Sequence, residues 1–112
     1  MTGAKVPTID AQTEIATLIN IYEVEPGKQA ELVKFLSEGT DKMFRHLRGF
    51  VSVSIHSSVD GTRVVNYAQW RSKEDVHRVM KNPDAQALAK RAALIAKSVS
   101  PAVYQVTAVH VG

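Results

Sequence analysis

The feature that most constrains the fold is the stretch "FVSVSIHSSVDGTRVVNYAQW", residues 50–70. Apolar and polar residues alternate in its first part, as they do in a strand whose two faces meet different surroundings. Asp60-Gly61 is a strong signal for a hairpin turn, and the chain then returns as a second strand rich in Val, Tyr and Trp. A hairpin at the centre of the chain predicts an antiparallel sheet.

Hydrophobic periodicity and turn signals supply the other elements. Ser72 and Asp75 form a capping box that opens a helix, and Asn82-Pro83 interrupts and restarts that helix. The predicted elements are a strand at 15–24, a helix at 29–47, the hairpin, a helix from 73 to about 97, and a strand at 102–111. This β-α-β-β-α-β order is the ferredoxin-like arrangement of an α+β protein, a four-stranded antiparallel sheet with helices on one face. We expect a homodimer in which the two bare sheet faces pack together.

Residues 1–14 are small and polar and contain Pro7, which predicts a flexible N-terminal arm or an arm that lies on a partner subunit. Residues 15–112 then form a single domain. Because no segment is typical of a signal peptide or a membrane span, we expect a soluble, cytoplasmic protein without a membrane partner. The formal net charge is only +3 and the basic residues are not clustered, which argues against a nucleic-acid partner.

Cofactor signals are missing from the sequence. Without cysteine, the chain has no thiolate nucleophile and no thiolate metal ligand. No two histidines stand at ligand spacing and no carboxylates cluster with them, so no metal site is predicted. A dinucleotide fingerprint, a P-loop and a G-x-S-x-G elbow are also missing. The chemistry would therefore use side chains and substrate alone, or a cofactor bound without a familiar signature.

The register of the hairpin decides which side chains share a face. A two-residue turn at Asp60-Gly61 would set His56 opposite Val65, so that His56 and Asn66 point to opposite faces. A three-residue loop with Gly61 left-handed in a bulge would shift the pairing by one and bring His56 and Asn66 to the same face. We favour the second register, because its polar face, with small residues and one large aromatic, suits a lined cavity.

In the favoured register, the polar face turns toward a cleft between sheet and helices. It holds Ser52, Ser54, His56, Asn66, Ala68 and Trp70. The other face holds Val51, Val53, Ile55, Val65 and Tyr67. Asn66 is an unusual strand residue because its amide needs hydrogen-bond partners, and this favours a site role over a core role.

The string "GFVSVSIHSSVDGTRVVNYAQWRSKED" resembles the antibiotic biosynthesis monooxygenases, which are small dimeric α+β-barrel proteins. The likeness covers about residues 15–110 and is strongest in the hairpin, where it points to the cofactor-free branch that acts on polyketides. The resemblance implies a homodimer that oxidises a polycyclic phenol or anthrone to a quinone with dioxygen. It implies no flavin and no metal, because the deprotonated substrate itself supplies the electrons.

The resemblance also implies roles for individual residues. Asn66 would donate hydrogen bonds to an oxyanion or peroxide, Trp70 would donate its indole N–H or stack on the substrate, and His56 would take or relay a proton. The predicted substrate-binding residues are Asn20, Ser54, Val76, Met80 and Lys90. Val76 stands where the relatives carry a tyrosine, and Lys90 would replace an arginine of their second helix, so the proton donor to the peroxide is left open.

Other activities on the same scaffold are alternatives. The heme-degrading branch of the superfamily would use Asn20, but Val79 and Ala89 stand near the positions where it carries a tryptophan and an axial histidine, which disfavours heme degradation. A non-oxidative, cofactor-free isomerase or cyclase is a second alternative. A small-molecule-binding dimer without turnover is a third, because fold does not determine function.

Overall fold

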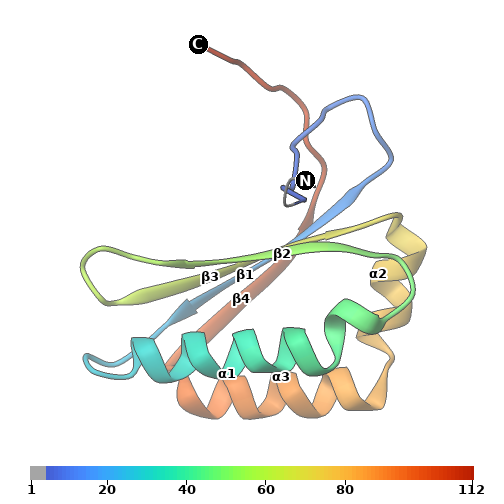
Figure 1. Ribbon diagram of the computed structural model, residues 1–112. Helices are drawn as coiled ribbons and strands as arrows, with labels where there is room; N and C mark the ends of the chain where they lie inside the picture. Colours follow the sequence, from blue (N-terminus) through green and yellow to red (C-terminus); the bar gives the residue numbers. More distant parts are fainter. Residues whose placement is uncertain (1–4) are drawn as a thin grey trace.

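The structure is a computed structural model that describes residues 5–112 (Figure 1). Its elements are β1 (Ala16–Glu23), α1 (Gln29–Lys42), the 3-10 helix η1 (Phe44–His46), β2 (Phe50–Ser57), β3 (Arg63–Trp70), α2 (Lys73–Met80), α3 (Pro83–Ile95) and β4 (Ser98–Tyr104). The predicted β-α-β-β-α-β order is confirmed, with the second helix divided in two at Asn82. None of the helices within these residues is long and apolar enough to cross a membrane.

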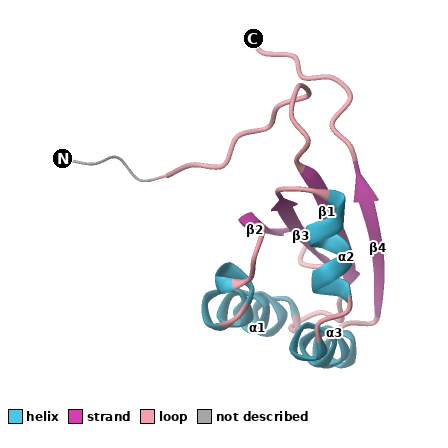
Figure 2. Ribbon diagram, turned by 90° about the vertical axis from the view of Figure 1, so that its right-hand side faces the viewer, coloured by secondary structure: helices cyan, strands magenta, loops and turns pink. Residues whose placement is uncertain are grey.

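The four strands form one antiparallel sheet in the order β2-β3-β1-β4. The helices lie on one face of the sheet, while the two terminal segments rise from the other side (Figure 1). Figure 2, turned by 90°, shows α1 and α3 side by side beneath the strands and β4 at the edge of the sheet. The ferredoxin-like fold with helices on one face is therefore confirmed.

The last strand begins earlier than predicted. The prediction was 102–111, whereas β4 spans Ser98–Tyr104 and includes Pro101. Proline has no backbone N–H to donate to a neighbouring strand. An inner strand, which is paired on both sides, therefore excludes it, whereas an edge strand tolerates it. Pro101 pairs with Asn20 of β1 and has no strand on its other side.

The predicted hairpin register was wrong. His56 pairs with Val65 and Ile55 pairs with Asn66, so the side chains of His56 and Asn66 point to opposite faces of the sheet. Gly61 is left-handed, with φ +80°, as predicted, but it makes no bulge in the ladder. The irregularity lies instead at the far end of the hairpin, between Phe50 and Ser52.

Side-chain hydrogen bonds within the loop explain this register. The Ser58 N–H donates to the Arg63 carbonyl at 3.0 Å, which leaves residues 59–62 as the connection between the strands. Inside it, Asp60 Oδ1 accepts hydrogen bonds from the N–H and the hydroxyl of Thr62, at 3.0 and 2.7 Å, and from the Ser58 hydroxyl at 2.8 Å. The resulting register is the one that a two-residue turn at Asp60-Gly61 would give, with His56 opposite Val65.

The faces are therefore exchanged for β2. Its apolar side chains Val53 and Ile55 pack toward the helices, each beside one of the two hydrophobic clusters of the core. Its polar residues Ser52, Ser54 and His56 point outward, on the face that also carries Val65 and Tyr67 of β3. The alternation in the sequence was read correctly, but the assignment of Val53 and Ile55 to the outward face was wrong.

The arm contacts the outward face of the sheet. Gln69, which is buried, donates from Nε2 to the Thr8 carbonyl at 2.7 Å and accepts from the Ser52 hydroxyl at 2.7 Å. The predicted flexibility of residues 1–14 stays a prediction, and its first four residues lie outside the described part of the chain.

Candidate active site

Two asparagines face each other across neighbouring strands on the helix-covered side of the sheet. Asn20 of β1 pairs directly with Asn66 of β3, and cross-strand partners place their Cβ atoms about 5 Å apart. Both residues are half-buried, and Asn66 Oδ1 is buried without a hydrogen-bond partner. A buried amide oxygen that the protein does not pair is a candidate to contact a ligand or an ordered water.

Two adjoining cavities lie between this face and the helices. The larger, called the chamber below, has a volume of about 230 Å³ and opens between β1, the edge strand β4, and helices α2 and α3. The smaller, called the recess, has a volume of about 70 Å³ and lies between the sheet, α1 and α3. Both are lined by Asn20, Phe44 and Ala89, so the chamber and the recess share a wall at these residues. Asn66 lines the recess.

The chamber walls are almost entirely apolar. Besides the three shared residues, they contain Leu18, Val79, Met80, Ala85, Gln86 and Pro101. Apolar walls with a few convergent polar groups are typical of a small-molecule site. The polar groups of the chamber are the amides of Asn20 and Gln86, and Asn66 adds a third amide in the adjoining recess.

Trp70 shares the face of Asn66 but lines neither cavity. It is 2% exposed and meets the Phe50 ring edge-on, with ring centroids 5.6 Å apart. Val79 and Ala85 belong both to its hydrophobic cluster and to the chamber wall, so Trp70 lies in the layer behind that wall. Its Nε1 is buried without a hydrogen-bond partner, which leaves one donor unused in this layer.

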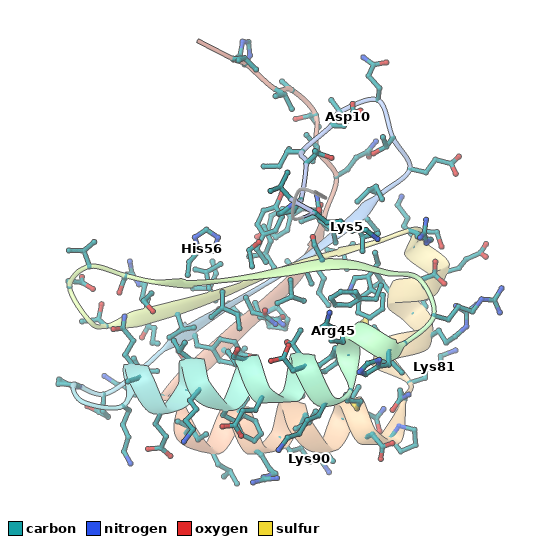
Figure 3. All side chains as sticks on the ribbon, viewed as in Figure 1. Lys5, Asp10, Arg45, His56, Lys81 and Lys90 are labelled. Carbon is teal, nitrogen blue, oxygen red and sulfur yellow. The ribbon has the colours of Figure 1, made fainter. Side chains whose placement is uncertain are left out.

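His56 and Ser54 do not reach the cavities. Both point outward, and Figure 3 shows His56 on the opposite side of the sheet from the helices. Their placement in the cleft was therefore wrong, because it depended on a register that the loop of residues 58–63 does not adopt.

The other predicted substrate-binding residues divide into two groups. Asn20 and Met80 line the chamber, and Met80 is 57% exposed at its mouth. Val76 is completely buried beside Trp70 and lines neither cavity. Lys90 is exposed and projects from α3 away from the sheet (Figure 3), while its neighbour Ala89 faces the cavities. The placement of Val76 and Lys90 in the site was therefore wrong.

Several cavity residues were missed, among them Phe44 and Tyr22. Phe44 lies in the short 3-10 helix after α1, where periodicity gives no signal. Tyr22 lines the recess and lies two residues after Asn20, so the alternation of β1 places it on the same face. Burial raises the pKa of the Tyr22 phenol above its ordinary value.

Among residues 5–112, no group of three or more His, Cys, Asp or Glu side chains could hold a metal ion. What the cavities offer instead is three amides, one phenol, one hydroxyl and mostly apolar walls. Such groups can orient a flat, apolar molecule and stabilise negative charge on one of its oxygens through N–H donors.

The family is decided by comparison with known proteins. Residues 15–91 match the antibiotic biosynthesis monooxygenase family. The chain belongs to this family. A curated relative, tetracenomycin-F1 monooxygenase of Streptomyces glaucescens, is 44% identical over 79 residues, which cover 70% of this chain and 70% of that protein. The predicted class of activity, a monooxygenase, is thereby confirmed.

Solved structures of two named oxygenases share the fold. One is a monooxygenase from the gene ActVA-Orf6 of Streptomyces coelicolor in complex with nanaomycin D, with a TM-score of 0.78 and 23% identity, covering 92% of this chain and 96% of that chain. Another is a variant of SnoaB, a cofactor-independent oxygenase from Streptomyces nogalater, with a TM-score of 0.76 and 17% identity, covering 87% and 97% of the two chains. These likenesses confirm the α+β fold of the family.

Proposed function

We propose that this family member is a cofactor-independent monooxygenase that oxidises a polycyclic phenol or anthrone to a quinone with dioxygen. The observation that carries the proposal is the facing pair Asn20 and Asn66 at the junction of an apolar chamber and a recess. The 44% identical relative, named for tetracenomycin F1, supports a polyketide-type aromatic substrate. The name of SnoaB as a cofactor-independent oxygenase supports a reaction without flavin or metal.

The geometry suits this chemistry because the substrate supplies the electrons. Loss of a ring C–H proton leaves an enolate, and its negative charge rests on an oxygen that amide N–H groups can stabilise. Asn20 and Asn66 provide such donors on walls that are mostly apolar. In such surroundings a charge-assisted hydrogen bond is stronger than in water. The electron-rich enolate then reduces dioxygen, and one oxygen atom enters the product as a carbonyl.

Trp70 does not contact the chamber directly, so its proposed donation to the substrate depends on a movement of the wall. Its unpaired Nε1–H lies one layer behind the chamber wall, so a contact with substrate requires Val79 or Ala85 to shift. His56 is no longer proposed as the proton relay of this cavity, because it lies on the other side of the sheet.

The working unit is proposed to be a homodimer. The outward face has no helix over it and exposes apolar side chains, among them Ile21 at 37% and Tyr104 at 47%. A second copy packed sheet to sheet would cover them, as exposed apolar faces of this kind commonly require. A cytoplasmic location stays a prediction from the sequence.

Oxygen uptake tests the proposal directly. Purified protein is mixed with an anthrone, and oxygen consumption and quinone absorbance are followed together. The proposal expects one dioxygen consumed for each quinone formed, by a protein whose spectrum lacks flavin and heme bands. Turnover that persists in the absence of dioxygen would instead identify a non-oxidative isomerase or cyclase, and binding without turnover would identify a binding protein.

A further inference from the structure

Tyr22 places a phenol in the wall of the recess. The residue is 5% exposed and lies on the same face of β1 as Asn20. Its cross-strand partner on β3 is Val64, so Tyr22 lies diagonal to Asn66 on the neighbouring strand. Diagonal positions are about 7–8 Å apart at Cα, a separation that an aromatic side chain can bridge. Tyr22 and Asn66 both line the recess.

Tyr22 is also the single titratable side chain among the described residues that line the chamber or the recess. The remaining polar groups are the amides of Asn20, Asn66 and Gln86 and the hydroxyl of Thr40. Thr40 Oγ1 already donates to the Leu36 carbonyl at 2.9 Å. No carboxylic acid, imidazole or ammonium group within residues 5–112 lines these walls.

The proposed reaction requires an acid. When the enolate carbon bonds to dioxygen, it forms a peroxide anion, and the O–O bond of that anion breaks readily only after the outer oxygen is protonated. An amide N–H can stabilise the anion but does not give up its proton. We propose that Tyr22 is the catalytic acid that protonates this peroxide; the inference rests on the proposed function.

The first substrate proton leaves to solvent, and the C–H electron pair forms the new C–O bond, reducing dioxygen to the peroxide. The Tyr22 O–H then protonates the outer oxygen. The resulting phenolate removes the second proton from the same carbon, the second C–H electron pair forms the C=O bond, and hydroxide leaves. Hydroxide takes a proton from solvent to become water, so CH₂ and O₂ give C=O and H₂O with Tyr22 restored.

The surroundings of Tyr22 support this cycle. Burial raises the pKa of the phenol, which keeps it protonated at neutral pH and makes the phenolate a strong enough base to recover its proton. The ring is held by the hydrophobic cluster of Val24, Leu32, Val64 and Ala92, so the position of the hydroxyl is constrained. A small recess also limits the number of water molecules that could replace the phenol as acid.

Tyr22→Phe tests the proposal because it removes the hydroxyl and keeps the packed ring. We expect kcat to fall by about 10²-fold, as for loss of a general acid. The KM for the anthrone should be unchanged, and the substrate peroxide should accumulate in place of part of the quinone. A structural role alone would not make this intermediate accumulate. Tyr67→Phe, on the outward face, is the matched control and should behave as wild type.

The outcomes distinguish a missing monooxygenase activity from a missing role of Tyr22. Wild-type turnover with dioxygen establishes the activity, whatever the variant does. If the wild type is active and Tyr22→Phe keeps its kcat and accumulates no substrate peroxide, the role of Tyr22 is overturned while the activity stands. If Tyr22→Phe does not fold, Tyr22→3-fluorotyrosine decides, because it keeps the ring and lowers the pKa of the phenol: a shifted pH profile of kcat supports the role, and an unchanged profile overturns it.

Discussion

Asn20 and Asn66 stand directly opposite each other on β1 and β3, with both amides on the face that the helices cover. Asn66 Oδ1 is buried and unpaired, so the pairing does not satisfy the hydrogen-bonding capacity of both amides. A buried amide oxygen without a hydrogen-bond donor costs free energy, so Asn66 Oδ1 does not contribute to stability as it stands. We propose that a bound phenol fills this role: its hydroxyl can donate to Asn66 Oδ1, and its oxygen can accept from the amide N–H groups of the pair.

The first prediction concerns Asn66. Asn66→Ala removes an amide that stabilises developing negative charge, and kcat for anthrone oxidation should fall by about 10²–10³-fold. The free energy of unfolding should change little, because the variant also removes an unsatisfied buried oxygen. Oxygen uptake and urea denaturation measure the two quantities. Equal turnover by wild type and variant would exclude Asn66 from the reaction.

The second prediction concerns His56. His56 points outward and pairs with Val65. We therefore expect His56→Ala to leave kcat, KM and the oligomeric state unchanged. Steady-state kinetics together with sedimentation measure this. A large loss of kcat in an intact assembly would mean that His56 acts on the substrate from the outward side, against the site described above.

The sequence predicted the fold because its signals are local. The alternation in residues 50–58, the capping pair Ser72 and Asp75, and the break at Asn82-Pro83 each depend on neighbours a few residues away. The structure confirms all three, and Ser72 Oγ accepts from the Asp75 N–H at 3.2 Å. Period two also places Asn66 and Trp70 on one face without any knowledge of the partner strands.

The site could be predicted only in part, because it depends on long-range pairing. A shift of one residue exchanges the two faces of a strand, and the shift was decided by hydrogen bonds of Asp60 that the sequence does not reveal. Because of this register, His56 and Ser54 point away from the cleft. Likewise, the opposition of Asn20 to Asn66 joins residues of two strands that are not neighbours in the chain.

The third prediction concerns Gly49, which turns the chain into β2. Its φ is +86°, and a Cβ added there would overlap Asp75 Cγ. Gly49→Ala should therefore lower the free energy of unfolding by about 2 kcal/mol or more, from backbone strain and steric overlap together. Gly27→Ala is the matched control: its φ is +89° but nothing lies within 4 Å, so about 1 kcal/mol is expected. Equal losses in chemical denaturation would exclude the contact with Asp75.

The fourth prediction is the pH dependence of stability at Asp75. Its hydrogen bond from the Ser72 hydroxyl, at 2.9 Å, and its ion pair with Arg78 hold the pKa of the carboxyl below its ordinary value. The native state therefore favours the carboxylate, so the stabilisation is present above the ordinary aspartate pKa, about 4, and is lost as the pH falls through the lower native value.

Asp75→Asn should accordingly be less stable than wild type at neutral pH, and the difference should shrink in acid. Urea denaturation at several pH values measures this. Asp41→Asn is the control, because the Asp41 side chain is 68% exposed in its pair with Arg45 and should contribute little at any pH. A difference between Asp75→Asn and wild type that did not depend on pH would contradict the assignment.

The fifth prediction tests the homodimer at the centre of the outward face. Ile21 lies between Val65 of β3 and Ser100 of β4 and is 37% exposed. If two sheets pack against each other, the wild type should sediment at twice the 12.3 kDa chain mass, and Ile21→Glu should sediment as a monomer, because a buried unpaired carboxylate is costly. Leu94→Glu is the control, since Leu94 is 86% exposed on α3, away from that face. A monomeric wild type, or equal dissociation by both variants, would rule out this interface.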